Sequence, residues 1–238
     1  MIEWLLSPIA PDRLHDVGVL VSWHGRLMVL AWGILVPLGI LIARFFKVVP
    51  GQDWPNRLDN PAWWHAHRVC QWSAFGLSVV AVGLILAAPS LHDRSVHAVF
   101  GWIVLSLLIV QVAGGLLRGT KGGPPDNGGG PASAGDHYDM TVRRQIFEHV
   151  HKTAGYVSWM MSIVALGLGL WLANALVWMW VVLLIWWAIV ILAFCVFQRQ
   201  DRALDTYQAI WGPNPTLPGN RRPPIGFGVR RRQGCSKP

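Results

Sequence analysis

Residues 19–46 read VLVSWHGRLMVLAWGILVPLGILIARFF, and almost every side chain in this stretch is apolar. A helix needs about 20 apolar residues to cross a hydrocarbon core of roughly 30 Å. The stretch is long enough, so it predicts a membrane-spanning helix. Pro37 lies inside it and predicts a kink, which membrane helices tolerate because neighbouring groups satisfy the freed backbone.

Four more apolar runs of similar length follow along the chain. The whole sequence is 53% hydrophobic and 13% charged, whereas soluble domains carry about 25% charged residues. We therefore predict an all-α integral membrane protein with five transmembrane helices. The four further helices are expected at residues 63–88, 96–117, 144–173 and 176–197.

The segments between and around these runs suggest a single membrane domain. The second and third runs are joined by a short turn at residues 89–95, and another short turn lies near Asn174. The glycine- and proline-rich stretch at 122–135, GGPPDNGGGPASAG, predicts a flexible loop. The end of the chain is polar, without the apolar periodicity of a packed domain. We expect a periplasmic segment 1–18, a transmembrane domain 19–197 and a basic cytoplasmic tail 198–238.

The basic residues indicate how the chain is oriented. Five spans place the termini on opposite sides, and only Arg13, Arg26 and Arg94 fall on the side of the N-terminus. The remaining 17 of the 20 basic residues fall on the other side. Lysine and arginine accumulate in cytoplasmic segments, so we expect the N-terminus in the periplasm and the C-terminus in the cytoplasm. The net charge of +8 is then a consequence of topology, and we expect no nucleic-acid partner.

Several of the nine histidines lie within or at the ends of the predicted spans. An ionisable side chain is costly there and is a candidate for a functional site. A single histidine at a helix end is more often an interfacial or hydrogen-bonded residue, so the case for ligands rests on the whole set. The nine are His15, His24, His65, His67, His92, His97, His137, His149 and His151.

Depth along the alternating helices sorts four of these histidines into two pairs. His24 lies about five residues, or roughly 7 Å, inside the outer boundary, and His97 opens the third helix at that same side. His67 and His151 lie a short way into the second and fourth helices, which begin at the cytoplasmic side. Alternate helices lie diagonally across an up-down four-helix bundle. Diagonal histidines at matched depth predict bis-histidine ligation of two haem b groups, one near each face.

Glycines next to the histidines support this interpretation. His97 and Gly101, like His151 and Gly155, form HxxxG patterns, and residues four apart share one face of a helix. Each glycine would leave a flat notch beside its histidine. Close helix packing by small residues is the alternative explanation of such a pattern. We choose His151 over its neighbour two residues earlier because Gly155 follows it.

The remaining choices concern the other histidines and the nearby charges. His67 is preferred to His65 because it lies deeper, while His92 is shallower than His97. His15 and His137 lie outside the spans, and we expect both to be solvated. Some basic residues are candidates for binding haem propionates, and the alternative is that they only mark topology or snorkel to the interface. These are Arg26 and Arg94 on the outer side, and Arg68, Arg118, Arg144 and Lys152 on the inner side.

Four blocks of the sequence resemble the cytochrome b561 family. They are HGRLMVLAWGILVPLGILIAR, HRVCQWSAFGL, HAVFGWIVLSLLIVQ and FEHVHKTAGY, within residues 23–172, and the likeness is closest to the bacterial and DOMON-associated form. The resemblance implies a four-helix core with two non-covalent haem b groups, and transmembrane electron transfer. It places the four ligands at His24, His67, His97 and His151. Family members commonly have six spans, and the ascorbate-associated signature of the animal and plant branch is not found in this sequence.

We therefore expect an electron-transfer cytochrome, an oxidoreductase component rather than an enzyme with its own substrate chemistry. Its expected partners are the lipid bilayer and a periplasmic redox protein, a dehydrogenase subunit or a quinone. It would act in a bacterial inner membrane, as a homodimer or as a subunit of a larger membrane complex. Two alternatives stay open: a stand-alone reductase of ferric iron or a small molecule, and a structural membrane subunit without redox activity.

Overall fold

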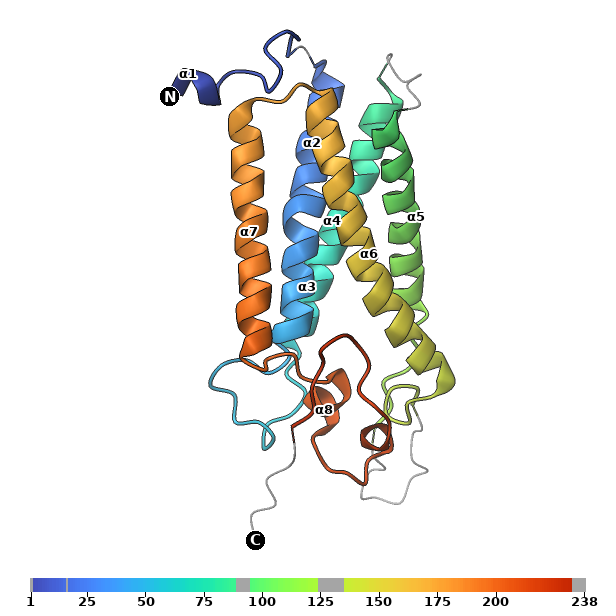
Figure 1. The fold of residues 1–238 in the computed structure, drawn as a ribbon. Helices are drawn as coiled ribbons and strands as arrows, with labels where there is room; N and C mark the ends of the chain where they lie inside the picture. The colour runs from blue at the N-terminus through green and yellow to red at the C-terminus, as the bar shows by residue number, and fades with distance from the viewer. Residues whose placement is uncertain (1, 16, 89–94, 124–134, 233–238) are drawn as a thin grey trace.

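Five long helices dominate the protein in a computed structural model that describes residues 2–15, 17–88, 95–123 and 135–232 (Figure 1). All five are long and apolar enough to span a membrane, and no strand occurs in these ranges. The predicted all-α membrane architecture is therefore confirmed, with boundaries within two residues of those expected. The spans are Val19–Phe45, Ala62–Leu86 (α4), Val96–Leu116 (α5), Val142–Leu172 (α6) and Val177–Arg199 (α7).

The first span is not a regular α-helix throughout. It consists of α2 (Val19–Met28), the π-helical segment η1 (Val29–Leu35) and α3 (Val36–Phe45). Pro37 lies in the first turn of α3, where its missing N–H leaves the carbonyl of Gly33 without the donor that a regular α-helix supplies. Where we expected a kink, the structure has a π-helical segment directly before α3, and segments of this kind often lie at functional sites.

The first four spans pack as a bundle. The first span contacts both α4 and α6 through all three of its segments, while α5 packs along α6. A core of Ala31, Trp32, Ala74, Val104 and Leu166 fills the middle of the bundle. α7 lies outside this group, beside α3 (Figure 1). The arrangement matches the expected up-down core of four helices with a fifth helix at its side.

The two ends of the bundle differ in how much chain covers them. α2, α5 and α7 begin at the end that also carries the N-terminal segment and the short helix α1 (Ile2–Leu5), which we call the N-terminal end (Figure 1). α4 and α6 begin at the opposite, C-terminal end. The side-chain amide of Asn174 donates hydrogen bonds to the carbonyls of Ala10 and Arg13, which ties the N-terminal segment to the α6–α7 turn. Most of the expected flexible loop, and both His92 and Arg94, lie outside the described residues.

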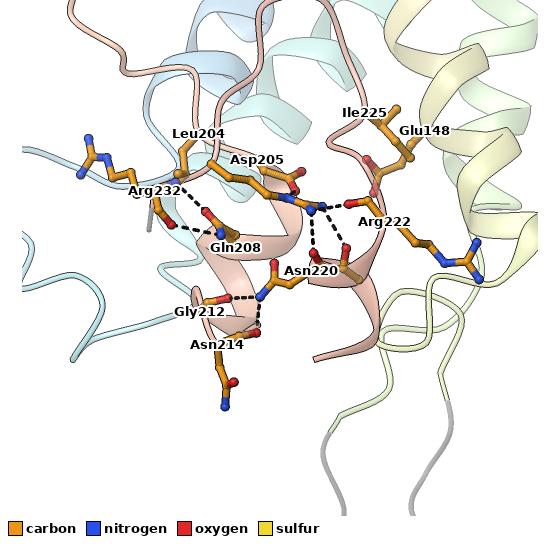
Figure 2. A network of polar contacts seen from close by, with 12 residues as sticks. Glu148, Leu204, Asp205, Gln208, Gly212, Asn214, Asn220, Arg222, Ile225 and Arg232 are labelled. Atoms are coloured by element: carbon orange, nitrogen blue, oxygen red, sulfur yellow. Dashed lines mark hydrogen bonds and ion pairs between the residues drawn. The ribbon is translucent and has the colours of Figure 1, made fainter. Parts of the chain in front are cut away.

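The polar tail forms a packed cap on the C-terminal end of the bundle, contrary to our expectation of no packed structure there. The cap contains α8 (Thr206–Trp211) and the 3₁₀ turn η2 (Pro218–Arg221). The side chain of Tyr207 is buried and packs with those of Met140 and Ile225. Polar contacts hold the cap together (Figure 2). The Arg231 guanidinium, for example, donates to the Asp205 carboxylate and to three backbone carbonyls. Such contacts leave no apolar periodicity in the sequence.

Candidate haem sites

The structure brings His24 and His97 together at the N-terminal end of the bundle. His24 lies on α2 and His97 on α5, and the centres of the two imidazole rings are 6.2 Å apart. The Nδ1 atom of His24 lies 2.9 Å from the carbonyl oxygen of Ala81, and that of His97 lies 2.9 Å from the carbonyl oxygen of Ala165. Each ring is therefore held by a backbone carbonyl of a neighbouring helix.

A second pair, His67 and His151, lies at the C-terminal end. His67 comes from α4 and His151 from α6, and their ring centres are 6.4 Å apart. The Nδ1 atom of His67 lies 3.0 Å from the carbonyl oxygen of Gly39. The Nδ1 atom of His151 is buried and has no hydrogen-bond partner among the described residues. The ring of Phe147 lies beside it, 5.0 Å away between centres.

The geometry of both pairs fits two axial ligands on one metal. A carbonyl oxygen only accepts hydrogen bonds, so the Nδ1 atoms of His24, His67 and His97 carry the proton and leave the Nε2 lone pair free. A metal–imidazole bond of about 2.0 Å, plus about 1.1 Å from a ring nitrogen to the ring centre, gives about 6.2 Å between two axial rings. The observed separations of 6.2 and 6.4 Å agree with this value. The residues present therefore fit a bis-histidine haem at each end.

The other histidines lie away from these two pairs. His65 and His149 are exposed, which agrees with the choice of His67 and His151 from each closely spaced pair. His15 is half-buried, and its Nδ1 atom lies 2.7 Å from the carbonyl oxygen of Ala173. Within the described residues, no group of three or more His, Cys, Asp or Glu side chains gathers as a metal site. The candidate metal ligands are therefore the two histidine pairs.

The two glycines of the HxxxG patterns border open space. A Cβ atom added at Gly101 would meet no atom within 4 Å, and one at Gly155 would meet only the Gln111 side chain, at 3.8 Å. Close helix packing therefore does not require either glycine. By contrast, Gly169 of α6 is needed for packing, because a Cβ there would lie 3.0 Å from the Cε1 atom of His97.

The basic side chains proposed as propionate partners differ in their surroundings. Arg26 is exposed and lies over the ring of Trp23. Arg68 and Arg118 both lie over the ring of Trp64, which itself stacks on His67. Arg118 is partly buried beside two other guanidinium groups, and burial is the main cause that lowers its pKa. The C-terminal end thus gathers positive charge around the His67–His151 pair.

Lys152 is engaged in a buried cluster that the sequence did not reveal. Its ammonium lies 2.6 Å from a carboxylate oxygen of Glu148, and the Arg144 guanidinium lies 3.0 Å from the other oxygen. Glu148 is only 3% exposed. It is the only acidic residue in the five predicted spans, and that isolation was a signal that could have marked it.

His137 is also part of this cluster, and our expectation for this residue was wrong. We expected it to be solvated, but it is 2% exposed and packs against Tyr207 and Trp211. Its Nε2 atom lies 3.7 Å from Glu148. Burial, reinforced by the nearby cations, lowers the pKa of His137 to about 3. The imidazole is therefore neutral at physiological pH, and its contact with Glu148 is not an ion pair.

Comparison with known proteins identifies homologues of one kind. A cytochrome b561, DM13 and DOMON domain-containing protein of Arabidopsis thaliana is 30% identical over 172 residues, which is 71% of this chain and 16% of that protein. A second Arabidopsis protein, with cytochrome b561 and DOMON domains, is 39% identical over 98 residues, or 40% of this chain and 23% of its own length. Human ferric-chelate reductase 1 is 28% identical over 168 residues, or 69% of this chain and 24% of its own length.

These matches support the cytochrome b561 family. The chain spans only 16–24% of the length of these three relatives, all of which are eukaryotic. No family model matches the chain, and no solved structure matches it. The fold and the comparisons together define a multi-pass helical membrane protein whose homologues are cytochrome b561 and ferric-chelate reductase proteins.

Proposed function

We propose that the protein is a dihaem b cytochrome of the cytochrome b561 family that carries electrons across a membrane. The observation behind this proposal is the presence of two histidine pairs, at 6.2 and 6.4 Å, at opposite ends of one helical bundle. His24 and His97 would hold one haem b, and His67 and His151 the other. When bound, each haem supplies a one-electron couple between ferric and ferrous iron.

The protein would contribute ligation, orientation and insulation. The carbonyls of Ala81, Ala165 and Gly39 fix three of the four imidazoles in the tautomer that presents Nε2. The apolar core around Trp32 separates the two pairs and excludes water, and the indole of Trp32 is held by a 3.0 Å hydrogen bond to the Ser78 hydroxyl. This role requires no general acid or base.

Other predicted site residues fit around the haems in supporting positions. The open space beside Gly101 and Gly155 would accommodate the faces of the two macrocycles. Arg26 would meet a propionate at the N-terminal end, while Arg68 would do so at the C-terminal end. Lys152 directly follows His151 in α6, and its ammonium, which is held by Glu148, would meet a propionate at the C-terminal end. Charge-assisted hydrogen bonds of this type are about twice as strong as neutral ones.

The proposed setting is the plasma membrane of a bacterium, following the resemblance to bacterial members of the family. Because basic residues accumulate in cytoplasmic segments, their excess at the C-terminal end supports a cytoplasmic C-terminus and a periplasmic N-terminus. Electrons would pass between a cytoplasmic or quinone partner and a periplasmic redox protein or dehydrogenase subunit. The chain would serve as a homodimer or as the membrane subunit of a larger complex.

Ferric reduction by the chain itself is a second candidate function. It is favoured by the similarity to human ferric-chelate reductase 1, which covers 69% of this chain. Both candidates share the two haems and differ in the final acceptor. Steady-state reduction of a ferric chelate by the purified chain, without a protein partner, would favour the second candidate.

Transmembrane transfer can be tested in proteoliposomes. Vesicles that hold the haem-loaded chain and contain trapped ferricyanide are mixed with an external, membrane-impermeant reductant. We expect the trapped ferricyanide to be reduced faster than in vesicles with the His67→Ala variant or without protein. Equal rates in the three preparations would rule out electron transfer across the membrane by this chain.

A further inference from the structure

Lys47 is a buried cation without a nearby counter-charge. It follows α3 and is 6% exposed. Its ammonium donates to the carbonyl of Leu204 at 3.0 Å and, at 3.4 Å, to that of Arg44. An ammonium has three N–H donors, so one is left over. No carboxylate oxygen lies within 4.0 Å of it in the described part of the chain.

The nearest carboxylates are committed to other partners. Asp205 and Glu148 act on Lys47 only from a distance. Asp205 is bound by the Arg231 guanidinium at 2.7 Å, and Glu148 by Lys152 at 2.6 Å. Burial is the main cause that lowers the pKa of the Lys47 amine to about 7. Because burying an unpaired charge is costly, the ammonium form of Lys47 is disfavoured, and a bound anion would stabilise it.

A second lysine, Lys152, lies where the cap meets the bundle. Lys152 donates to the carbonyl of Ile225 at 2.9 Å, as Lys47 does to that of Leu204, so the cap holds both ammonium groups through its backbone. Figure 2 shows Glu148 and Ile225 where the cap meets α6. Two cations, Lys152 and Arg144, bind the one Glu148 carboxylate, and Lys47 adds a third positive charge at this end of the bundle.

This group of cations belongs to the same end of the bundle as the His67–His151 pair. Lys152 directly follows His151 in α6. Lys47 lies eight residues beyond Gly39, the residue whose carbonyl holds His67. It is also close enough to His67 to act on the imidazole electrostatically. The unpaired ammonium therefore lies at the end of the bundle that carries the proposed His67–His151 haem site.

We propose that Lys47 binds a carboxylate, and that this carboxylate is a propionate of the haem held by His67 and His151. The inference rests on the proposed dihaem function. Haem b carries two propionates, and an ammonium–carboxylate hydrogen bond would satisfy both the free N–H and the uncompensated charge. The cap would then take part in holding this haem, because its Leu204 carbonyl positions the ammonium. A soluble carboxylate is the other source of the same chemistry.

The test compares haem b with its dimethyl ester, which has no free carboxylate. The protein and its Lys47→Met and Lys47→Arg variants are loaded with either group, and the release of each haem to apomyoglobin is timed. With haem b, we expect Lys47→Met to speed release from the His67–His151 site about tenfold or more, the effect of one lost charge-assisted hydrogen bond. Lys47→Arg should retain most of the parent rate. With the ester, parent and Lys47→Met should release the haem at equal rates.

The His24–His97 site and a surface lysine provide the controls. Release from the His24–His97 site should not change in any variant, which shows that the chain remains folded. Lys121→Met removes an exposed lysine that pairs with Asp59, and it should leave both rates unchanged. If Lys47→Met speeds the release of haem b and of its dimethyl ester equally, then Lys47 has only a structural role, and the proposal would be overturned. No effect with either haem would show that Lys47 does not hold a propionate and would also overturn the proposal. Fewer than two haems in the parent would refute the dihaem function itself.

Discussion

The indole Nε1 of Trp186 donates a 2.7 Å hydrogen bond to the backbone carbonyl of Gly33. Pro37 occupies the position whose N–H would bond to that carbonyl in a regular α-helix. A side chain of α7 thus supplies this carbonyl of the π-helical segment with a donor that Pro37 cannot supply. Within a membrane, where water is not available as a substitute, such satisfaction is required. α7 is therefore fastened to the four-helix core by a specific contact.

Replacing Trp186 with Phe should weaken this attachment. We expect the free energy of unfolding to fall by about 1–3 kcal/mol, because the Gly33 carbonyl loses its donor. The measurement is unfolding by SDS in mixed micelles. Trp187→Phe is the matched control, since it removes the same ring atoms from a neighbouring indole whose Nε1 has no partner among the described residues. Equal losses in the two variants would show that the hydrogen bond contributes nothing.

Gly169→Ala should disturb the N-terminal haem site alone. The added Cβ atom would lie 3.0 Å from the Cε1 atom and 3.3 Å from the Nδ1 atom of the His97 ring, which must shift. We expect the variant to retain less than about half of the haem at that site, because ligand geometry tolerates little displacement. Gly167→Ala, two residues away in the same helix, meets no atom within 4 Å and should retain both haems. Haem content per site, read from difference spectra, decides between these outcomes.

His137 should make the stability of the protein sensitive to acid. Its pKa is about 3 in the folded chain and about 6.5 when unfolded, so between these values only the unfolded chain takes up the proton. Stability therefore falls as the pH decreases from about 6.5 toward 3. Between pH 7 and 5 the loss from this group should be about 2 kcal/mol. Thermal unfolding of the parent and of His137→Phe measures it, and a variant with the parent's full acid sensitivity would contradict the assignment.

Arg231 should be essential for the cap. Its guanidinium binds the buried Asp205 carboxylate at 2.7 Å, and loss of a buried pair costs about 3–5 kcal/mol. We expect Arg231→Gln to expose Tyr207 and Trp211, so that chymotrypsin cuts α8 at least about tenfold faster. Arg230→Gln removes a pair with Asp201 whose side chains are both more than half exposed, and it should leave the cap resistant. Resistance of both variants would show that the cap does not depend on Arg231.

The sequence predicted the membrane helices well because their signal is local. A continuous apolar run marks each span, and short turns separate the second span from the third and the fourth from the fifth. The selection of histidines also followed from local features. Depth favoured His67 over His65, and Gly155 four residues further on favoured His151 over His149; the structure brings His67 and His151 together at the C-terminal end. His24 and His97 likewise meet at the other end.

What the sequence did not reveal depends on contacts between distant segments. The Lys47 ammonium donates a hydrogen bond to the carbonyl of Leu204, which is 157 positions away in the chain. No repeating pattern in the sequence predicts that contact. His137 lies in a glycine-rich, polar stretch, yet it is buried because Tyr207 and Trp211 of the cap fold over it. The cap itself is held by side-chain bonds to backbone carbonyls. Propensity and hydropathy carry little information about such bonds.

The central claim is that two histidine pairs hold two haems. Its most direct test is the haem content per purified chain, with reduced-minus-oxidised spectra, for the parent, His24→Ala and His67→Ala. The exposed His65 and His149 provide controls, since their alanine variants should retain the parent's haem content. We predict two haems in the parent and one in each test variant, with a different spectral component lost from each. One haem or none in the parent, or the loss of the same component from both variants, would contradict the account.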